Sequence, residues 1–423
     1  MNPDLSEAYI NLGVVLKDIN KLDQAEFYLR KAIEINSYSS LAYLNLGATL
    51  RDIGHLKEAE YFLRKALLLN SNCSNNHTHL GRILNENGHL EESEFHLRKA
   101  IELDPNKKEY RFNLSQLLLK CKKFEEAWKE NEWRWNTKVF IGRKLETSKP
   151  EWEPGFRGSV LLWAEQGIGD QIMLSTLIPD FIDQVDHLIV KVDKRLIPLL
   201  ERSCSPELSF IDQEQYINES EYDYQIAMGS LPRYLRTSVE SFRSGKKFKL
   251  KSNQEQSEFL RSKLLDDGCE KIVGISWKSS NTMFDSNLQL DKFITGIHTS
   301  KIRFVCLQYG DVADEIKHVR ETYGIEVFEV EEIDKFNDID GLASLISACD
   351  QIVTIENLNI FLGGLLEIDT KVIINTRYWW GFGIDDKQNF WFPSLTHFRA
   401  EKYREWDTPL RQIRDEIKIY SDE

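Results

Sequence analysis

The residues best placed to do chemistry lie in a glycine-rich turn at 165–170. The turn has the sequence Glu-Gln-Gly-Ile-Gly-Asp and follows an apolar run, Val160 to Trp163, that predicts a short buried strand. An apolar pattern with helical spacing comes next, so the order is strand, turn, helix. Gly167 and Gly169 let the backbone turn sharply and bring the helix start close to a ligand. Asp170 then stands where a side chain could point into a cleft, although a purely structural tight turn would have the same sequence pattern.

A second group of polar residues stands at the ends of strands expected later in the chain. Apolar runs bounded by turn residues predict strands at 271–277, 303–308 and 351–355. Ligands bind parallel α/β sheets at the carboxyl ends of such strands. The residues found there supply a cation, hydroxyls, amides and a carboxylate, and they are Trp277, Lys278, Ser279, Gln308, Tyr309, Glu356, Asn357 and Asn359.

A fold must position these residues, and the sequence of the last two thirds of the chain predicts two α/β halves. Short strands alternate with helices over 159–255, and the pattern restarts over 256–423 after a basic, polar connector. Each half is therefore expected to be a Rossmann-like parallel sheet with helices. A terminal helix is predicted at 409–419, packing back on the first half.

The first third of the chain repeats itself every 34 residues. Leu12-Gly13, Leu46-Gly47 and Leu80-Gly81 align, as do small residues later in each unit. A period of 34 built from two helices resembles the tetratricopeptide repeat. The repeat array is predicted to span 1–135. Proline and glycine then break the helical pattern, which predicts a linker at 136–158.

Two roles are open for this array. It could form a concave groove that holds a protein or peptide, with Asn11, Asn45, Asn76 and His77 on or near the helices that line it. It could instead be a helical extension that supports the next domain or makes a homodimer. No metal site is expected, because His77 and His79 lack acidic or cysteine neighbours.

Composition limits the possible partners. The net charge of −14 over 423 residues disfavours nonspecific binding to nucleic acid or to an anionic membrane. The 6 cysteines include no CxxC pair, which is typical of buried thiols in a reducing compartment. No apolar run approaches the roughly 20 residues that a membrane span needs. We therefore expect a soluble, cytoplasmic protein.

The motifs of the α/β part resemble a known family. In type, order and spacing they are similar to the GT-B glycosyltransferases, and more narrowly to the heptosyltransferase-like family that occurs fused to tetratricopeptide repeats. The segment 125–135 resembles the usual join in that fusion. The motifs that carry the resemblance are 163–179, 273–281, 306–311, 338–357 and 379–399.

The resemblance implies transfer of a sugar from a nucleotide-diphosphate sugar, a substrate and not a cofactor, to a protein or glycan acceptor bound by the repeats. In the family the aspartate after the first glycine turn is the proposed base, and Asp170 takes that position here. A carboxylate in a closed cleft can accept a hydroxyl proton. The alternative is that Asp170 caps the helix that follows. Inversion at the anomeric carbon is expected.

The resemblance also assigns the donor site. Lys278 would stabilise the leaving diphosphate, and the helix after Asn357 would direct its amino end at the same phosphates. Gln308 and Tyr309 would contact the base and ribose. No DxD motif ends a strand of the first half, so a metal-independent reaction is expected. The cleft loops implied by the resemblance contain Gln166, Gly167, Gly169, Trp379, Trp380 and Asp385.

One motif departs from the family. Where the family has a hydroxyl residue and a histidine, this chain has Asn359 and Phe361. An amide can hydrogen-bond a phosphate, whereas a phenyl ring cannot. The departure favours a second interpretation, a noncatalytic repeat scaffold with a degenerate transferase domain. A hydrolase that uses Asp170 is disfavoured, since no Ser/His/Asp arrangement is evident.

Overall fold

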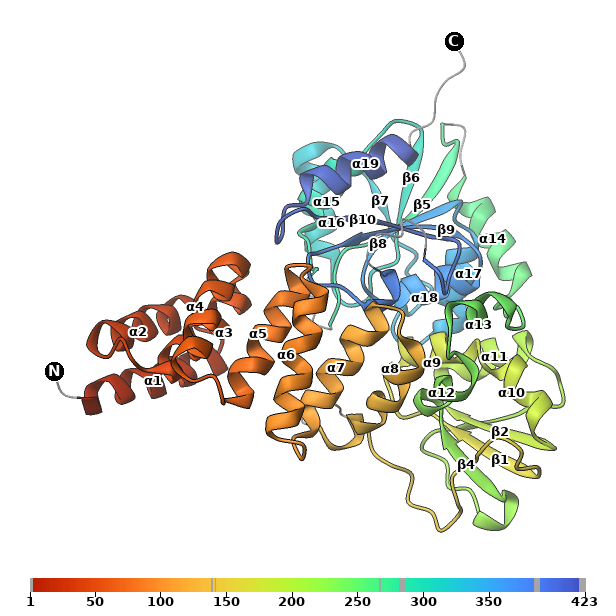
Figure 1. The fold of residues 1–423 in the computed structure, drawn as a ribbon. Coiled ribbons are helices and arrows are strands. Elements are labelled where there is room, and N and C mark those ends of the chain that lie inside the picture. Colours follow the sequence, from red (N-terminus) through yellow and green to blue (C-terminus); the bar gives the residue numbers. More distant parts are fainter. Residues whose placement is uncertain are drawn as a thin grey trace. The chain divides into compact units, whose positions relative to one another are not determined.

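The structure is a computed structural model that describes residues 3–137, 140, 142–265, 268–280, 286–383 and 389–417. The chain divides into two compact units, residues 1–140 and 141–423 (Figure 1). The boundary lies at 140, whereas the sequence suggested that the repeat array ends at 135.

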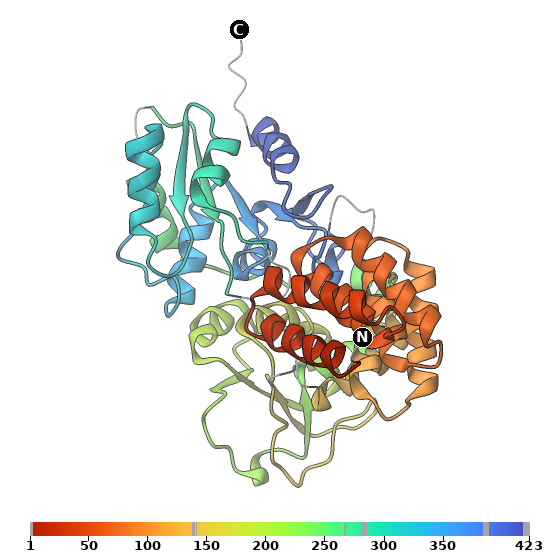
Figure 2. The same cartoon turned by 90° about the vertical axis from the view of Figure 1, so that its left-hand side faces the viewer.

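Unit 1 consists of successive pairs of antiparallel helices, as the 34-residue period predicts. Figures 1 and 2 show each pair lying beside the next. The last helix is short and leads into a 3-10 turn. The elements are α1 (Pro3–Asp18), α2 (Leu22–Ile35), α3 (Ser40–Ile53), α4 (Leu56–Leu69), α5 (Ser74–Glu86), α6 (Leu90–Leu103), α7 (Lys108–Lys120), α8 (Phe124–Asn131) and η1 (Glu132–Asn136).

Glycine allows the two helices of a unit to touch. A Cβ added at Gly13 of α1 would lie 2.6 Å from Cγ of Leu29 on α2, and Leu29 is completely buried. The same close approach recurs at Gly47 and Gly81, where the added Cβ would meet a leucine Cγ at 2.6 and 2.8 Å. Any side chain at these positions would push the paired helices apart.

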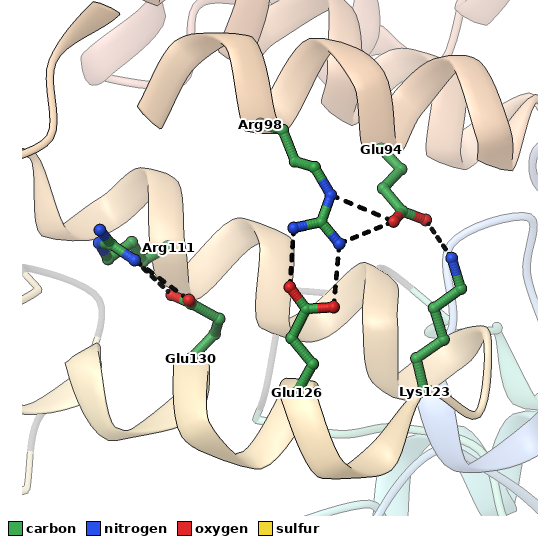
Figure 3. Close-up of polar contacts among 6 residues, drawn as sticks. All are labelled: Glu94, Arg98, Arg111, Lys123, Glu126 and Glu130. Atoms are coloured by element: carbon green, nitrogen blue, oxygen red, sulfur yellow. Dashed lines mark hydrogen bonds and ion pairs between the residues drawn. The ribbon is translucent and has the colours of Figure 1, made fainter. Parts of the chain in front are cut away.

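Charged residues link each unit to the next through the second helices of the pairs. Arg98 on α6 donates to Glu94 one turn earlier, at 2.9 Å, and to both oxygens of Glu126 on α8, at 2.7 and 2.9 Å (Figure 3). Lys123 donates to the other oxygen of Glu94 at 2.7 Å. Arg64 makes the equivalent bonds one unit earlier. Because the pattern repeats, it orients successive units in the same way.

The first half of unit 2 is a 4-stranded parallel sheet with strand order β3-β2-β1-β4. The central strand β1 has β2 on one side and β4 on the other. The strands are β1 (Ser159–Trp163), β2 (His187–Val192), β3 (Ser209–Asp212) and β4 (Tyr224–Ala227). The helical elements are α9 (Ile168–Ser175), α10 (Ile178–Phe181), η2 (Ile182–Gln184), η3 (Lys194–Leu196), α11 (Ile197–Ser203), η4 (Glu219–Glu221), η5 (Met228–Ser230), α12 (Pro232–Leu235) and α13 (Val239–Ser244).

The second half is a 6-stranded parallel sheet with strand order β10-β9-β8-β5-β6-β7. Its strands are β5 (Lys271–Ser276), β6 (Ile302–Cys306), β7 (Val327–Phe328), β8 (Gln351–Ile355), β9 (Asp369–Ile374) and β10 (Leu395–Arg399). Its helical elements are α14 (Gln254–Leu264), α15 (Leu290–Ile297), α16 (Ala313–Tyr323), α17 (Ile339–Ser347), α18 (Leu358–Leu365), η6 (Trp380–Phe382) and α19 (Asp407–Ile417). The expected architecture of a repeat array followed by two α/β halves is therefore confirmed.

Two elements of the second half differ from expectation. Within the described residues, α19 packs against α15, β9 and β10 of its own half instead of returning to the first half (Figure 1). Leu410, Ile413 and Ile417 form one apolar stripe that completes the core of this sheet, so the prediction of a returning helix was wrong. Strand β10 was not predicted from the sequence, because it follows a segment dominated by aromatic residues.

The segment expected to be a linker packs on the first sheet. The backbone N–H of Trp152 donates to the carbonyl of Gln225 on β4 at 2.9 Å. The Trp152 ring is completely buried, with its centroid 4.8 Å from that of Phe181 and 5.5 Å from that of Tyr234. The part of the linker around Trp152 is therefore an extension of the first half.

Candidate active site

The expected site residues surround two topological switch points in unit 2. The first switch lies between β1 and β4, and the second lies between β5 and β8. At such points the loops that leave adjacent strands diverge, which opens a crevice at the carboxyl edge of the sheet. Glu165 follows β1, Gly229 follows β4, Lys278 follows β5, and Glu356 and Asn357 follow β8.

Hydrogen bonds hold the first switch point together. Glu165 is buried, and its carboxylate accepts the backbone N–H of Gly229 at 3.1 and 3.3 Å. Gln171 on α9 donates to the carbonyl of Gln166 at 3.0 Å and accepts the N–H of Asp193, which follows β2, at 2.9 Å. These bonds tie the glycine turn to the ends of β1, β2 and β4, so they fix where α9 begins.

Asp170 lies in the first turn of α9 and is partly accessible to solvent. Protein atoms nevertheless surround its carboxyl group closely. Lost solvation, assisted by the negative charge of Glu165, raises the pKa of Asp170 to about 6. Hydrogen bonds from the backbone N–H groups of Asp170 itself and of Gly167 oppose the shift. Those bonds fit a cap, whereas accessibility and a pKa near neutrality fit a general base.

Amide side chains shape the loop at the second switch point. Gln308 follows β6 and is buried, and its Oε1 accepts the backbone N–H groups of Trp277 at 3.1 Å and Lys278 at 2.8 Å. Asn357 caps α18 and donates to Oγ of Ser276 at 2.7 Å and to the carbonyl of Lys278 at 3.3 Å. Both amides therefore position the backbone around Lys278.

Three residues expected to contact the donor have partners within the protein. The ammonium group of Lys278 forms an ion pair with Glu315 on α16, and Glu315 also accepts the indole N–H of Trp277 at 3.1 Å. The Trp277 ring is completely buried, so this residue belongs to the core and not to a ligand surface. The backbone N–H of Ser279 donates to Asn287 at 2.7 Å. A diphosphate at this loop would compete with Glu315 for Lys278.

Tyr309 and Asn359 also lie at this edge. The Tyr309 hydroxyl accepts the backbone N–H of Ser280 at 2.8 Å, and its ring centroid lies 5.7 Å from that of Phe336. Asn359 is 3% exposed. Its Nδ2 reaches the carbonyl of Leu307 at 3.5 Å, while its Oδ1 has no hydrogen-bond partner among the described residues. A buried amide oxygen that lacks such a partner can accept a hydrogen bond from a bound group.

Glu356 connects two loops of the second sheet. Its Oε1 accepts the backbone N–H of Trp379 at 2.6 Å, and its Oε2 accepts the hydroxyl of Ser286 at 2.9 Å. Burial raises the pKa of Glu356 to about 8, although both hydrogen bonds oppose the shift. The carboxyl group is therefore mainly protonated at neutral pH, and it joins the loops after β5 and β9 to the end of β8.

Phe361 is part of α18, and its ring packs against the start of α9. A Cβ added at Gly169 would lie 3.0 Å from Cε2 of Phe361, so the ring packs directly on the glycine. Trp379 meets Phe361 edge-on at a centroid distance of 5.5 Å, and Trp380 lies 5.1 Å from Trp379. Because α9 follows β1 and α18 follows β8, this contact shows that the carboxyl edges of the two sheets face each other.

Polar contacts between distant residues also join the halves, and sequence reasoning missed the two that follow. The indole N–H of Trp391 donates to the hydroxyl of Thr176 at 3.1 Å, across 215 residues of sequence. Arg202 on α11 forms an ion pair with Asp340 on α17. No local pattern marks such residues, since each depends on a partner more than a hundred positions away.

The groove residues proposed for unit 1 divide into two groups. Asn76 is buried and donates to oxygens of the preceding unit, so it has a structural role. His77 is buried too, its Nδ1 lies 2.8 Å from Nδ1 of His96, and lost solvation lowers its pKa. The prediction that these two residues face the groove was wrong. Asn11 and Asn45 retain solvent exposure.

No metal-binding group and no membrane span occur in the described part of the chain. No three His, Cys, Asp or Glu side chains there lie close enough together to hold a metal ion. None of the described helices has the length and apolar character needed to cross a membrane.

Asp385 lies outside the described residues, as do 281–285. A cavity of about 270 Å³ is lined by the starts of β6 and β7, at the amino edge of the second sheet, away from both switch points.

Family comparisons identify the repeats of unit 1. A family described as "Tetratricopeptide repeat" matches residues 6–38 and 75–107, and a second family with the same description matches 41–70. Unit 1 therefore contains tetratricopeptide repeats, as the period predicted. Repeats of this kind are typical of proteins that interact with other proteins.

One curated relative extends beyond the repeats. Protein FlbA of Caulobacter vibrioides is 26% identical over 331 residues, which are 74% of this chain and 55% of that protein. The match must reach into unit 2, since unit 1 ends at residue 140. The chain spans about half the length of this curated relative.

Two solved repeat proteins resemble part of this chain. YrrB, a TPR protein with an unusual peptide-binding site, is 28% identical, covering 29% of this chain and 63% of that one with a TM-score of 0.26. The pilF protein of Pseudomonas aeruginosa is 30% identical, covering 30% of this chain and 59% of that one with a TM-score of 0.29. Both cover less than a third of this chain.

Proposed function

We propose that unit 2 is a glycosyltransferase that moves a sugar from a nucleotide-diphosphate sugar to a protein or glycan acceptor bound by the repeats. The observation that supports this best is the arrangement of the two carboxyl edges. The edge that carries Asp170 faces the edge that carries Lys278 and Asn357. Such a pair of edges can hold an acceptor on one half and a donor on the other.

The reaction needs a base and a group that stabilises the leaving charge. Asp170, with a pKa of about 6, is mainly ionised at pH 7.5 and can take the proton of an acceptor hydroxyl. The hydroxyl oxygen then bonds to the anomeric carbon as the bond from that carbon to the diphosphate breaks, with inversion. Lys278 and the amino end of α18 would stabilise the negative charge that develops on the diphosphate.

Specific contacts also support a second function, a noncatalytic scaffold that binds partners through its repeats. Phe361 packs on Gly169, where the resembling family has a histidine, and Glu315 holds the ammonium group of Lys278. A scaffold would keep the fold while these contacts close the crevice. This alternative predicts that no nucleotide sugar turns over.

Release of nucleoside diphosphate from a panel of nucleotide sugars tests the proposal. The panel contains UDP-, GDP-, ADP-, CDP- and dTDP-sugars, incubated with the full chain with and without a cell-derived acceptor extract. We expect one donor to be consumed, Asp170→Asn to abolish release, and Asp186→Asn to leave it unchanged. Asp186 is a suitable control because it is an acid of the same half whose side chain is 62% exposed. Release that is equal for wild type and Asp170→Asn would remove Asp170 from the role of base.

A further inference from the structure

The first helix of the array carries an apolar stripe that nothing in the described structure covers. Leu5, Leu12 and Val15 on α1 and Ile19, directly after its last residue, are 47%, 39%, 56% and 56% exposed, and Ala8 between them is exposed as well. The spacing alternates between three and four residues. This spacing produces the narrow a/d seam through which two helices pack on each other. The opposite side of α1 packs on α2 and α3 (Figure 1).

Later units bury the corresponding positions. In the 34-residue register, the positions of Ala8, Leu12 and Val15 recur in α3, α5 and α7. The residues at these recurring positions are at most 3% exposed, because the preceding unit covers them. They are Ala42, Asn76 and Tyr110 for the first, Leu46, Leu80 and Leu114 for the second, and Thr49, Ile83 and Leu117 for the third. The stripe on α1 is therefore a surface of the kind that this array uses for packing.

We propose that the stripe is a dimer interface, in which α1 of one copy packs on α1 of a second copy about a two-fold axis. The proposal does not depend on the transferase activity of unit 2. A symmetric contact brings the same apolar face from both copies, so each stripe covers the other. Exposed apolar patches on soluble proteins commonly mark such interfaces.

The structure at the far end of the array favours the two-fold contact between α1 helices over a head-to-tail contact. A head-to-tail contact would place α1 on the second helix of another copy's last unit. That helix, α8, has only 8 residues, whereas α2, α4 and α6 have 14 each. The turn η1 follows it directly and packs on α7, and Arg134 within η1 is 1% exposed. The far end of the array therefore lacks a full-length second helix of the kind that covers α3, α5 and α7, whereas α1 of a second copy offers the same apolar face.

Side-chain sizes favour an antiparallel pair. With the axis near Leu12, Leu5 faces Ile19 of the second copy and Ala8 faces Val15 of the second copy. The one small residue of the stripe, Ala8, then faces the larger Val15, which fills the space more evenly. A parallel pair would place Ala8 against Ala8 and leave a gap. Opposed helix dipoles also favour the antiparallel arrangement.

The mass of the full chain in solution tests the proposal. Sedimentation velocity from 1 to 200 µM is expected to show a monomer that converts to a dimer as concentration rises. Val15→Glu should weaken the dimer at least tenfold, and Ile19→Glu should do the same. Leu68→Glu is the matched control, because Leu68 is 77% exposed on α4, away from the stripe, and it should dimerise like wild type. A wild type that stays monomeric at 200 µM, or a dimer unaffected by both stripe variants, would overturn the proposal.

Cross-linking tests the direction of the helices. Under mild oxidation, Leu12→Cys should form an intermolecular disulfide because it lies beside the axis. Leu5→Cys should not link to itself, since the two copies of residue 5 would be roughly 20 Å apart at 1.5 Å per residue. The wild type, with its free cysteines at other positions, gives the background. Linking of Leu5→Cys without linking of Leu12→Cys contradicts the antiparallel dimer.

Discussion

At the scale of single residues, two acids distinguish the switch points of unit 2. The pKa of Asp170 is raised to about 6 and that of Glu356 to about 8, in both cases chiefly by lost solvation. An acid whose pKa rises on folding destabilises the folded state once it is ionised. Such acids occur often at functional sites, where the surroundings shift a pKa to suit the reaction even though the shift lowers the stability of the fold.

Asp170→Asn separates the two roles considered for this residue. The folded pKa of about 6 exceeds the ordinary value of 3.8, so ionisation lowers stability progressively between those pH values. We expect the uncharged amide to raise the free energy of unfolding at pH 7.5 by about 1–2 kcal/mol, with the gain disappearing toward pH 4. Urea unfolding at both pH values measures this. A residue that only caps α9 would instead make the variant less stable, by about 1 kcal/mol, at pH 7.5.

Glu356→Gln should show a wider pH dependence. The folded pKa of about 8 lies above the ordinary value of 4.5, so the wild type loses stability as the pH rises between these values. The difference in unfolding free energy between variant and wild type should grow by on the order of 2–4 kcal/mol from pH 5 to pH 8 and then level off. Urea unfolding at pH 5, 6.5, 8 and 9 gives the profile. A difference that does not change with pH would mean that Glu356 is ionised throughout.

At the scale of elements, one ion-pair pattern recurs along the repeats. Arg30, Arg64 and Arg98 each bond a glutamate one turn earlier and a glutamate of the next unit. Their side chains are 39–45% exposed, so each contact stabilises only modestly. Because the contact recurs in successive units, the summed contribution to the stability of the array exceeds that of any single ion pair.

Arg98→Gln should lower stability by about 0.5–1 kcal/mol in 50 mM salt, and by less in 1 M salt, where screening is strong. Arg98 donates to Glu126 and holds the pKa of that carboxyl below its usual value. The contribution is therefore present above the ordinary carboxylate pKa and is lost as the pH falls through the depressed value. Thermal unfolding followed by circular dichroism tests this. Lys129→Gln, which breaks an ion pair more than two thirds exposed on both sides, is the control. A loss that salt does not change would indicate lost packing of the Arg98 stem.

The sequence predicted those elements whose signals are local. The period revealed α1 to α6, and apolar runs revealed β1, β2 and β8 within one residue of their observed bounds. The sequence did not reveal α15 or β10, and the prediction that α19 packs on the first half was wrong. The destination of α19 depends on how its apolar stripe fits β9, β10 and α15, which no local pattern records.

The same distinction holds for the site. Residue types after the strands predicted which side chains would gather at the carboxyl edges, and Glu356 and Asn357 lie there as expected. The sequence could not show that Trp277 is buried or that Glu315 pairs with Lys278. Nor could it show that the ring of Phe361 would rest on Gly169. Each depends on the three-dimensional fit of distant segments.

At the scale of the whole molecule, the two units have different architectures, a helical repeat array and a pair of parallel sheets. Unit 1 contains tetratricopeptide repeats and offers surfaces for partners, including the exposed stripe on α1. Unit 2 places two carboxyl edges face to face, and we propose that a nucleotide sugar binds between them. If unit 2 is catalytic, we propose that the repeats bind the acceptor. In a scaffold the repeats are the only working part.

Calorimetric titration of the full chain with UDP, GDP, ADP, CDP and dTDP tests directly whether unit 2 binds the nucleotide that a sugar transfer would release. Binding of a leaving nucleotide requires neither the natural acceptor nor the correct sugar. We expect one of the five to bind with a stoichiometry near one. Lys278→Ala should weaken that binding at least fivefold, while Lys292→Ala, which removes a comparable ion pair of the same half, should not. A folded wild type that binds none of the five would contradict the proposed transferase function and favour the noncatalytic repeat scaffold.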